Sequence, residues 1–272
     1  MQDQARKGAA FRALHHRNRA FVIPNPWGRG SAHLLERAGF EALATTSAGY
    51  AFSRGLRDNR VGREGMLAHI RDIAQSTVLP VSADLENGFG DDPETVAQTL
   101  RLAAEAGAVG GSIEDATGDA QHPVYDFNLA VERVQAAVEA VRGLPFPFTL
   151  TARAENFIAG NPDLEDTLDR LCAYERAGAD VLYAPGLSRR EDIAGVLAAI
   201  GRPLNVLAGV KGMTLDLAAM SRLGVARVSI GSALARTAYG AAIAAISEMR
   251  DHGGFAFAND APSHTTLDQM FD

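Results

Sequence analysis

The feature that most constrains the fold is an alternation of short β-rich runs with longer helical patterns, repeated eight times along 272 residues. The β-rich runs are dominated by apolar residues, and the stretches between them combine Ala, Leu, Glu and Arg at helical spacing. The pattern predicts strands over residues 21–26, 42–47, 81–86, 110–115, 148–155, 181–186, 204–209 and 227–231. Examples of the helices predicted between them span 95–106, 129–141, 164–177 and 192–200.

Glycine stands at the end of several predicted helices, where the chain must turn toward the next strand. Gly39, Gly107, Gly178 and Gly224 occupy this position, which favours the left-handed conformation of a helix C-terminus. Eight such cycles predict an α/β protein with a single (β/α)8 TIM barrel over residues 1–272, of which 250–272 form a C-terminal tail. A doubly wound sheet is the main alternative, but the segment PNPWGRG at 24–30 matches its glycine-rich phosphate turn poorly.

Composition excludes several classes of function. The net charge of −7 argues against nucleic acid as a partner, because phosphate binding needs a basic surface. No apolar run approaches the roughly 18 residues that cross a bilayer, so no membrane association is expected. The single cysteine, Cys172, excludes an intrachain disulfide, and the polar N-terminus lacks the apolar segment of a signal peptide. These features predict a cytoplasmic protein.

Carboxylates gather at the predicted ends of the third and fourth strands. The side-chain period of two places Asp84 and Glu86 on one face, and likewise Ser112 and Glu114. In a barrel, these strand ends meet at the catalytic face. Two unit charges about 5 Å apart repel by roughly 3 kcal/mol at an effective dielectric near 20. The grouping therefore predicts a bound cation or a shared proton, with ordinary salt bridges as the alternative.

The fifth predicted strand adds a cation to this group. Arg153 is suited to a two-pronged contact with a carboxylate or phosphate, although it would also serve to neutralise the acidic residues. After the second strand, the hydroxyls and backbone amides of the turn over Thr46, Ser47, Ala48 and Gly49 are candidates to receive another anionic oxygen. Oxygen ligands beside an anion clamp suit a 2-oxo acid and the stabilisation of an enolate.

The histidines contribute less to this reading. His122 is the only one placed near the predicted site, in the loop after the fourth strand, and a surface position is its alternative. His15 and His16 are predicted to lie on the solvated face of a helix.

Four motifs together resemble the isocitrate lyase/phosphoenolpyruvate mutase superfamily: GLRD at 55–58, DLENGFG at 84–90, SIED at 112–115 and TARAE at 151–155. The similarity spans about residues 11–249. It implies a barrel enzyme that uses Mg²⁺ and acts on oxo or hydroxy acids through an enolate. It also implies a last helix exchanged between subunits in a homo-oligomer, a dimer or tetramer.

The resemblance assigns roles to individual positions. It implies that Asp84 binds the metal directly and that Asp58, Glu86 and Glu114 surround the metal, mostly through waters. Arg153 is implied to contact the substrate, and the turn from Thr46 to Gly49 to hold the substrate carboxylate. We expect Arg153, Glu114 and His122 as the catalytic residues, and Asp84 also to contact the substrate.

The sequence departs from the superfamily in informative ways. Glu86 stands where Asp is usual, which puts the metal requirement in question. The loop ATGDAQHPVYDF at 116–127 contains neither the Cys of the lyase loop KKCGH nor the Lys of the mutase loop, and Ala184-Pro185 replaces a lyase Glu. The reaction expected is therefore decarboxylation of a small 2-oxo acid such as oxaloacetate, which needs no proton donor for its leaving group. Three alternatives remain: C–C cleavage with His122 or Tyr125 as the acid, hydrolysis or transfer at a phosphonopyruvate-type C–P bond, and binding of an oxo acid without turnover.

Overall fold

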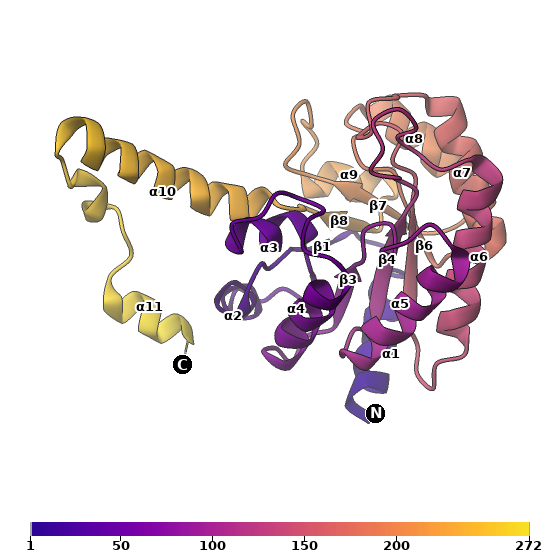
Figure 1. Ribbon diagram of the computed structural model, residues 1–272, viewed down its shortest axis with the longest axis horizontal. Coiled ribbons are helices and arrows are strands. Elements are labelled where there is room, and N and C mark those ends of the chain that lie inside the picture. Colours follow the sequence, from indigo (N-terminus) through magenta and orange to yellow (C-terminus); the bar gives the residue numbers. More distant parts are fainter. Residues whose placement is uncertain (1, 272) are drawn as a thin grey trace.

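Eight parallel strands form a nearly closed barrel in the computed structural model, which describes residues 2–271 (Figure 1). Around the barrel the strand order is β1-β8-β7-β6-β5-β4-β3-β2, and the Ala44 N–H donates to the Pro24 carbonyl at 3.1 Å between β2 and β1. This confirms the predicted TIM barrel. The strands are β1 (Phe21–Ile23), β2 (Leu43–Ala44), β3 (Val81–Asp84), β4 (Gly110–Glu114), β5 (Thr149–Arg153), β6 (Val181–Tyr183), β7 (Leu204–Leu207) and β8 (Arg227–Ser229).

A helix follows each strand, and most of the helices cover the outside of the barrel (Figure 1). They are α1 (Gln2–Leu14), α2 (Arg29–Arg37), α3 (Ser47–Ser53), α4 (Arg63–Gln75), α5 (Pro93–Glu105), α6 (Phe127–Arg142), α7 (Leu164–Ala177), α8 (Arg190–Ala199), α9 (Leu217–Leu223), α10 (Ala233–His252) and α11 (His264–Phe271), with a 3-10 turn η1 (Ala256–Asn259) before the last. The four glycines expected after helices all have positive φ: Gly39, Gly107, Gly178 and Gly224. These residues turn the chain into the following strand.

The strands end earlier than the sequence predicts, and one consequence concerns the site. Strand β3 ends at Asp84, and Glu86 has a φ of 50°, in the left-handed region. The prediction that a continuous strand places Glu86 on the face of Asp84 is therefore wrong. Non-glycine residues adopt this conformation rarely, and such residues concentrate at functional sites.

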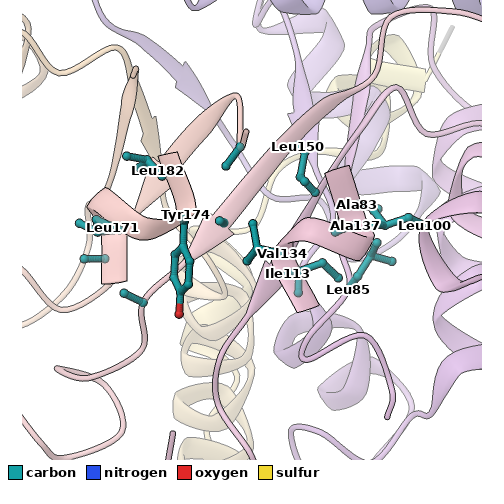
Figure 2. Close-up of a cluster of buried hydrophobic side chains, with 14 of the residues drawn as sticks. Ala83, Leu85, Leu100, Ile113, Val134, Ala137, Leu150, Leu171, Tyr174 and Leu182 are labelled. Carbon is teal, nitrogen blue, oxygen red and sulfur yellow. The ribbon is translucent and has the colours of Figure 1, made fainter. Parts of the chain in front are cut away.

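The main hydrophobic core lies between the strands β3 to β8 and the helices α4 to α9, and Figure 2 shows its part between β3 to β6 and α5 to α7. The close-up labels side chains from both layers: Ala83, Leu85, Leu100, Ile113, Val134, Ala137, Leu150, Leu171, Tyr174 and Leu182. Alternate residues of β5 face opposite ways, so Leu150 and Ala152 pack against helices while Thr151 and Arg153 face the barrel interior. This rigid wall supports the polar residues at the strand ends.

The N-terminal end of the barrel is covered by α1, with one correction to the sequence analysis. His15 is only 5% exposed, and its ring packs edge-on against the rings of Phe11 and Phe21, with centroids 4.8 and 5.1 Å apart. Its Nδ1 lies 2.9 Å from the Phe11 carbonyl oxygen. The expectation of a solvated position is wrong for His15 but holds for His16, which is exposed.

The C-terminal tail contains helical elements, η1 and α11, rather than an extended chain. Helix α10 projects away from the barrel, and the chain then turns back to α11, which contacts α2 (Figure 1). The only buried residue of α10 is Ala235, near the start of the helix. No helix between residues 2 and 271 has the length and apolar character needed to cross a membrane.

Candidate active site

Residues from all eight strands line a cavity of about 270 Å³ at the C-terminal end of the barrel. It is bounded on one side by the start of α3 and on the other by the loop after β5. A second, wider cavity of about 1090 Å³ opens beside it under the loop after β4. Asp58 and Glu114 line both cavities, so the two form one continuous acidic region. Its place is the one that barrel enzymes use for catalysis.

Arg153 is the centre of this region. Its guanidinium makes three ion pairs, with Asp84 Oδ1 at 3.2 Å, Glu114 Oε2 at 3.0 Å and Glu155 Oε1 at 2.8 Å. The same group lies 5.1 Å from the centre of the Tyr183 ring. Burial opposes the charge of Arg153, but the surrounding carboxylates, Glu114 foremost, hold its pKa above the ordinary value. The predicted neighbourhood of Arg153 with Asp84 and Glu114 is therefore present.

Asp84 is held from the side of α3 as well. Its Oδ2 accepts hydrogen bonds from the Ser47 N–H and Oγ at 2.9 and 2.8 Å, while its own N–H donates to Thr45 Oγ1 at 2.8 Å. Thr46 caps the helix, accepting from the Gly49 N–H at 3.2 Å. The first turn of a helix leaves amides without intrahelical partners, so the Ala48 N–H beside Asp84 is available to an anionic ligand.

Gly49 shows how closely this turn is packed. A Cβ built on it would lie 2.7 Å from Thr46 Cγ2 and 3.2 Å from the Cβ atoms of Trp27 and Ala235. Any side chain at this position would displace the helix start from the pocket. The predicted anion turn over residues 46–49 therefore lies at the cavity, with Thr46, Ser47 and Ala48 in its wall.

The carboxylates outnumber the cation that faces them. Partial desolvation at the cavity walls, with the repulsion of Asp84 second, raises the pKa of Asp58, although this residue is exposed. Burial, then Asp84 and Asp58, raises the pKa of Glu86 to about 7. Burial also raises the pKa of Glu114, although Arg153 opposes that shift. Desolvation is the largest cause of each shift, and repulsion between the carboxylates adds to it, so a bound cation would stabilise their ionised forms.

Glu86 lies on the outer side of this group. It lines the wider cavity rather than the inner one, is 8% exposed, and its Oε1 has no hydrogen-bond partner among the described residues. A buried carboxylate oxygen without a partner is costly. A metal ion, or a water bound to one, would give this oxygen the partner that it lacks.

The donor set fits a hydrated divalent cation. Within residues 2–271, no three His, Cys, Asp or Glu side chains converge closely enough to bind one ion directly. Mg²⁺ commonly takes one or two carboxylates and keeps several waters. Asp84 at the cavity wall, with the unpartnered oxygen of Glu86 and the carboxylates of Asp58 and Glu114 around it, matches that mode of binding.

His122 is not brought to the cavities. Its side chain is 81% exposed, its Nδ1 lies 3.4 Å from Asp119 Oδ2, and it lines neither cavity. Tyr125, at the end of the same loop, is fixed: its hydroxyl donates to Asp91 Oδ1 at 2.5 Å and accepts from Asn87 Nδ2 at 2.9 Å. The structure thus anchors the loop at Tyr125 and leaves His122 in solvent.

Two buried groups have contacts that the sequence did not predict. Asp115 accepts from Tyr174 Oη at 2.6 Å and from Arg170 Nη1 at 3.1 Å, which ties the end of β4 to α7. Arg227, also part of the cavity lining, donates to Asn205 Oδ1 at 2.8 Å and to Thr151 Oγ1 at 2.9 Å. The only sequence signal for Arg227 was a lone charge at the start of an apolar strand.

Curated relatives of this chain include enzymes and uncharacterized proteins. An uncharacterized protein of Mycobacterium tuberculosis is 31% identical over 224 residues, which are 82% of this chain and 82% of that protein. An oxaloacetate decarboxylase of Bradyrhizobium diazoefficiens is 32% identical over 145 residues, 52% of this chain and 48% of the decarboxylase.

Solved structures share the whole architecture. A candidate lyase/mutase of Burkholderia cenocepacia J2315 superposes with a TM-score of 0.97 at 59% identity, covering 100% of this chain and 97% of that one. Phosphonopyruvate hydrolase in complex with oxalate and Mg²⁺ superposes with a TM-score of 0.85 at 25% identity, covering 97% and 94%. The sequence profile described as phosphoenolpyruvate phosphomutase matches residues 11–250. With the strand-end carboxylates and Arg153 in place, this match shows that the chain belongs to the phosphoenolpyruvate mutase family, within the isocitrate lyase/phosphoenolpyruvate mutase superfamily.

Proposed function

We propose that this protein is a lyase that decarboxylates a small 2-oxo acid resembling oxaloacetate, through an enolate stabilised by a divalent cation. The observation that carries the proposal is the arrangement around Asp84, with Ser47 on one oxygen and Arg153 on the other, beside carboxylates whose pKa values are raised. Several carboxylates face one arginine here, so an acid substrate needs further positive charge to bind. A cation together with Arg153 and the helix amides supplies the missing positive charge.

The proposed roles follow from position. Asp84 would hold Mg²⁺, and the carboxylates of Asp58, Glu86 and Glu114 would surround it. The Ala48 N–H and Arg153 orient the substrate carboxylate and the oxygen of its ketone. The bound cation supplies electrostatic stabilisation to the charge that develops on that oxygen.

The reaction balances without a protein acid for the leaving group. The bond between C3 and the departing carboxylate breaks, CO₂ leaves, and the electron pair of that bond remains on the substrate as an enolate. Water then protonates the enolate carbon to give the product 2-oxo acid. The exposed position of His122 agrees with this route, since a cleavage that needs a general acid would require that group at the cavity.

Relatives support the proposal and one alternative. Oxaloacetate decarboxylase is among the relatives by name, and phosphonopyruvate hydrolase crystallised with Mg²⁺ has the same fold. The second candidate is hydrolysis or transfer at a C–P bond, since this reaction needs the same groups, Arg153 and the helix amides, to bind an oxo acid. A binding protein without turnover is the third, because the loop at 116–127 contains neither Cys nor Lys.

The test is pyruvate release from oxaloacetate, measured with Mg²⁺ and with EDTA. We expect turnover that EDTA abolishes and that Asp84→Asn reduces by at least about a hundredfold, consistent with loss of a charged ligand worth a few kcal/mol. The control is Asp72→Asn, which alters an exposed aspartate paired only with Arg29 at the surface. Turnover of phosphonopyruvate but not oxaloacetate would establish the second candidate. Saturable binding of both without turnover would establish the third.

We also propose that the chain forms a homo-oligomer, a dimer or tetramer, through an exchanged α10. The support is an apolar stripe on this projecting helix, in which Tyr239, Ile243, Ile246 and Met249 are 37–62% exposed. These positions recur at helical spacing, which is typical of a face that packs against another surface. The cytoplasm is the proposed compartment, on the strength of the single cysteine.

A further inference from the structure

A third cavity lies at the opposite end of the barrel from the candidate active site. Its volume is about 540 Å³, and it is walled by the end of α1, the end of α6 and the starts of β5 and β6. No role proposed above uses it. Its lining is basic, with Arg12, Arg142 and Arg202 against a single carboxylate, Asp180. This is notable in a chain whose net charge is −7.

The three arginines have no carboxylate partner among residues 2–271. The Arg12 guanidinium donates only to the carbonyl oxygen of Phe148, at 3.4 Å, and no hydrogen bond or ion pair joins the guanidinium group of Arg142 or Arg202 to another described residue. Asp180 is already engaged, because its Oδ2 accepts from the Leu150 N–H at 2.8 Å. Three solvent-exposed arginines thus face one carboxylate, and the cavity has a net positive charge.

One further polar group lines the cavity. Thr149 lines the cavity, is 1% exposed, and its Oγ1 has no hydrogen-bond partner among the described residues. A buried hydroxyl without a partner beside unpaired guanidinium groups is the donor set of an anion site.

We infer that this cavity binds a small dianion, a phosphate or a dicarboxylate, at a site separate from the catalytic pocket. Arginine suits both ligands because its planar fork matches the geometry of either oxyanion. The cavity also borders the catalytic pocket: His15 lines it, and His15 Nε2 lies 3.2 Å from Nη1 of Arg227, which lines the pocket above. The side chains of His15 and Arg227 would therefore lie between an anion in this cavity and the catalytic pocket.

Calorimetric titration of the full-length protein with inorganic phosphate, and separately with malonate, tests the inference. The titrations are made at constant ionic strength on wild type, Arg142→Gln and Arg202→Gln. The matched control is Arg71→Gln, which removes an exposed arginine of α4 that does not line the cavity. We expect at least one probe to bind wild type and Arg71→Gln equally, and to bind each cavity variant at least about tenfold more weakly, as the loss of one charged hydrogen bond implies.

The outcomes separate this site from the catalytic pocket. Binding by phosphate alone or by malonate alone supports the site and identifies its ligand chemistry. Binding that survives both cavity substitutions but is lost in Arg153→Gln belongs to the catalytic pocket and overturns the inference. It is also overturned if neither probe binds at millimolar concentration, or if Arg71→Gln weakens binding as much as the cavity variants do. Thermal unfolding of each variant without ligand confirms that it is folded before it is titrated.

Discussion

Ser47 and Asp84 are joined by two hydrogen bonds that end on the same oxygen: the N–H and the Oγ of Ser47 both donate to Asp84 Oδ2, at 2.9 and 2.8 Å. This pair fixes the first turn of α3 against the end of β3. Arg153 holds the other oxygen of Asp84 at 3.2 Å. Both oxygens of the carboxylate are thus oriented before any ligand arrives, as preorganised sites require.

Ser47→Ala tests this contact, because it removes the Oγ hydrogen bond and leaves the backbone one. A hydrogen bond to a charged group contributes about 1.5–3 kcal/mol, so we expect kcat/KM to fall by about tenfold to a hundredfold. Steady-state kinetics on the substrate identified by the oxaloacetate assay give the value. Ser53→Ala is the matched control, because the Ser53 hydroxyl donates only to the Tyr50 carbonyl at the exposed end of the same helix. An equal fall in kcat/KM in both variants would show that the hydrogen bond from Ser47 Oγ to Asp84 does not contribute to catalysis.

Glu86 gives the stability of the metal-free protein a distinctive pH dependence. Burial, and then the repulsion of Asp84 and Asp58, raises the pKa of Glu86 to about 7 in the folded state from its ordinary value of 4.5. Between these values the folded state binds more protons than the unfolded state, so stability falls as pH rises through that window. The shift corresponds to an upper bound of about 3 kcal/mol.

We therefore expect Glu86→Gln to lack this decline. Urea unfolding in EDTA, at about pH 5 and above pH 7, measures the free energies of unfolding of wild type and variant. The control is Glu139→Gln, an exposed position on α6. The assignment is wrong if wild type and Glu86→Gln lose the same stability between the two pH values.

The fold and the centre of the site follow from local sequence patterns. Helical and strand periodicity, glycine after helices and carboxylates at strand ends place Asp84, Glu114 and Arg153 together, because a barrel brings consecutive strand ends to one face. Glu86 was misplaced because periodicity assumes that a strand continues. The backbone leaves the strand at Asp84, and no residue pattern marks that departure.

Long-range contacts account for what the sequence did not predict. His15 and Arg227 are 212 positions apart and meet only because α1 closes the barrel end under β8. Two adjacent histidines at the end of a polar helix are typical of a solvated face, and nothing local distinguishes the one that becomes buried. The arginines of the cavity at the N-terminal end of the barrel likewise come from segments far apart in the chain.

His15 provides a second pH prediction, of opposite sign to that of Glu86. Burial, and then the charge of Arg227, lower the pKa of His15 to about 3 from 6.5. Below pH 6.5 the unfolded state binds more protons, so stability is present above that pH and declines as pH falls. We expect the stability difference between wild type and His15→Gln to shrink by about 2 kcal/mol between pH 6.5 and about pH 5. Urea unfolding across this range checks it, and the exposed neighbour variant His16→Gln should keep the wild-type pH dependence.

The apolar stripe of α10 leads to a prediction about assembly. Ile243 is 62% exposed and lies near the middle of the stripe, so burial of this helix against another subunit would place it in an apolar contact. Ile243→Glu puts a charge into that contact, where an unpaired carboxylate costs several kcal/mol. We expect wild type to elute as a dimer or tetramer and Ile243→Glu as a monomer in size-exclusion chromatography with light scattering. Ala244→Glu places the same charge about a quarter turn away, off the stripe, and should leave the assembly intact. A monomeric wild type, or an oligomer that Ile243→Glu does not disturb, would remove α10 from the interface.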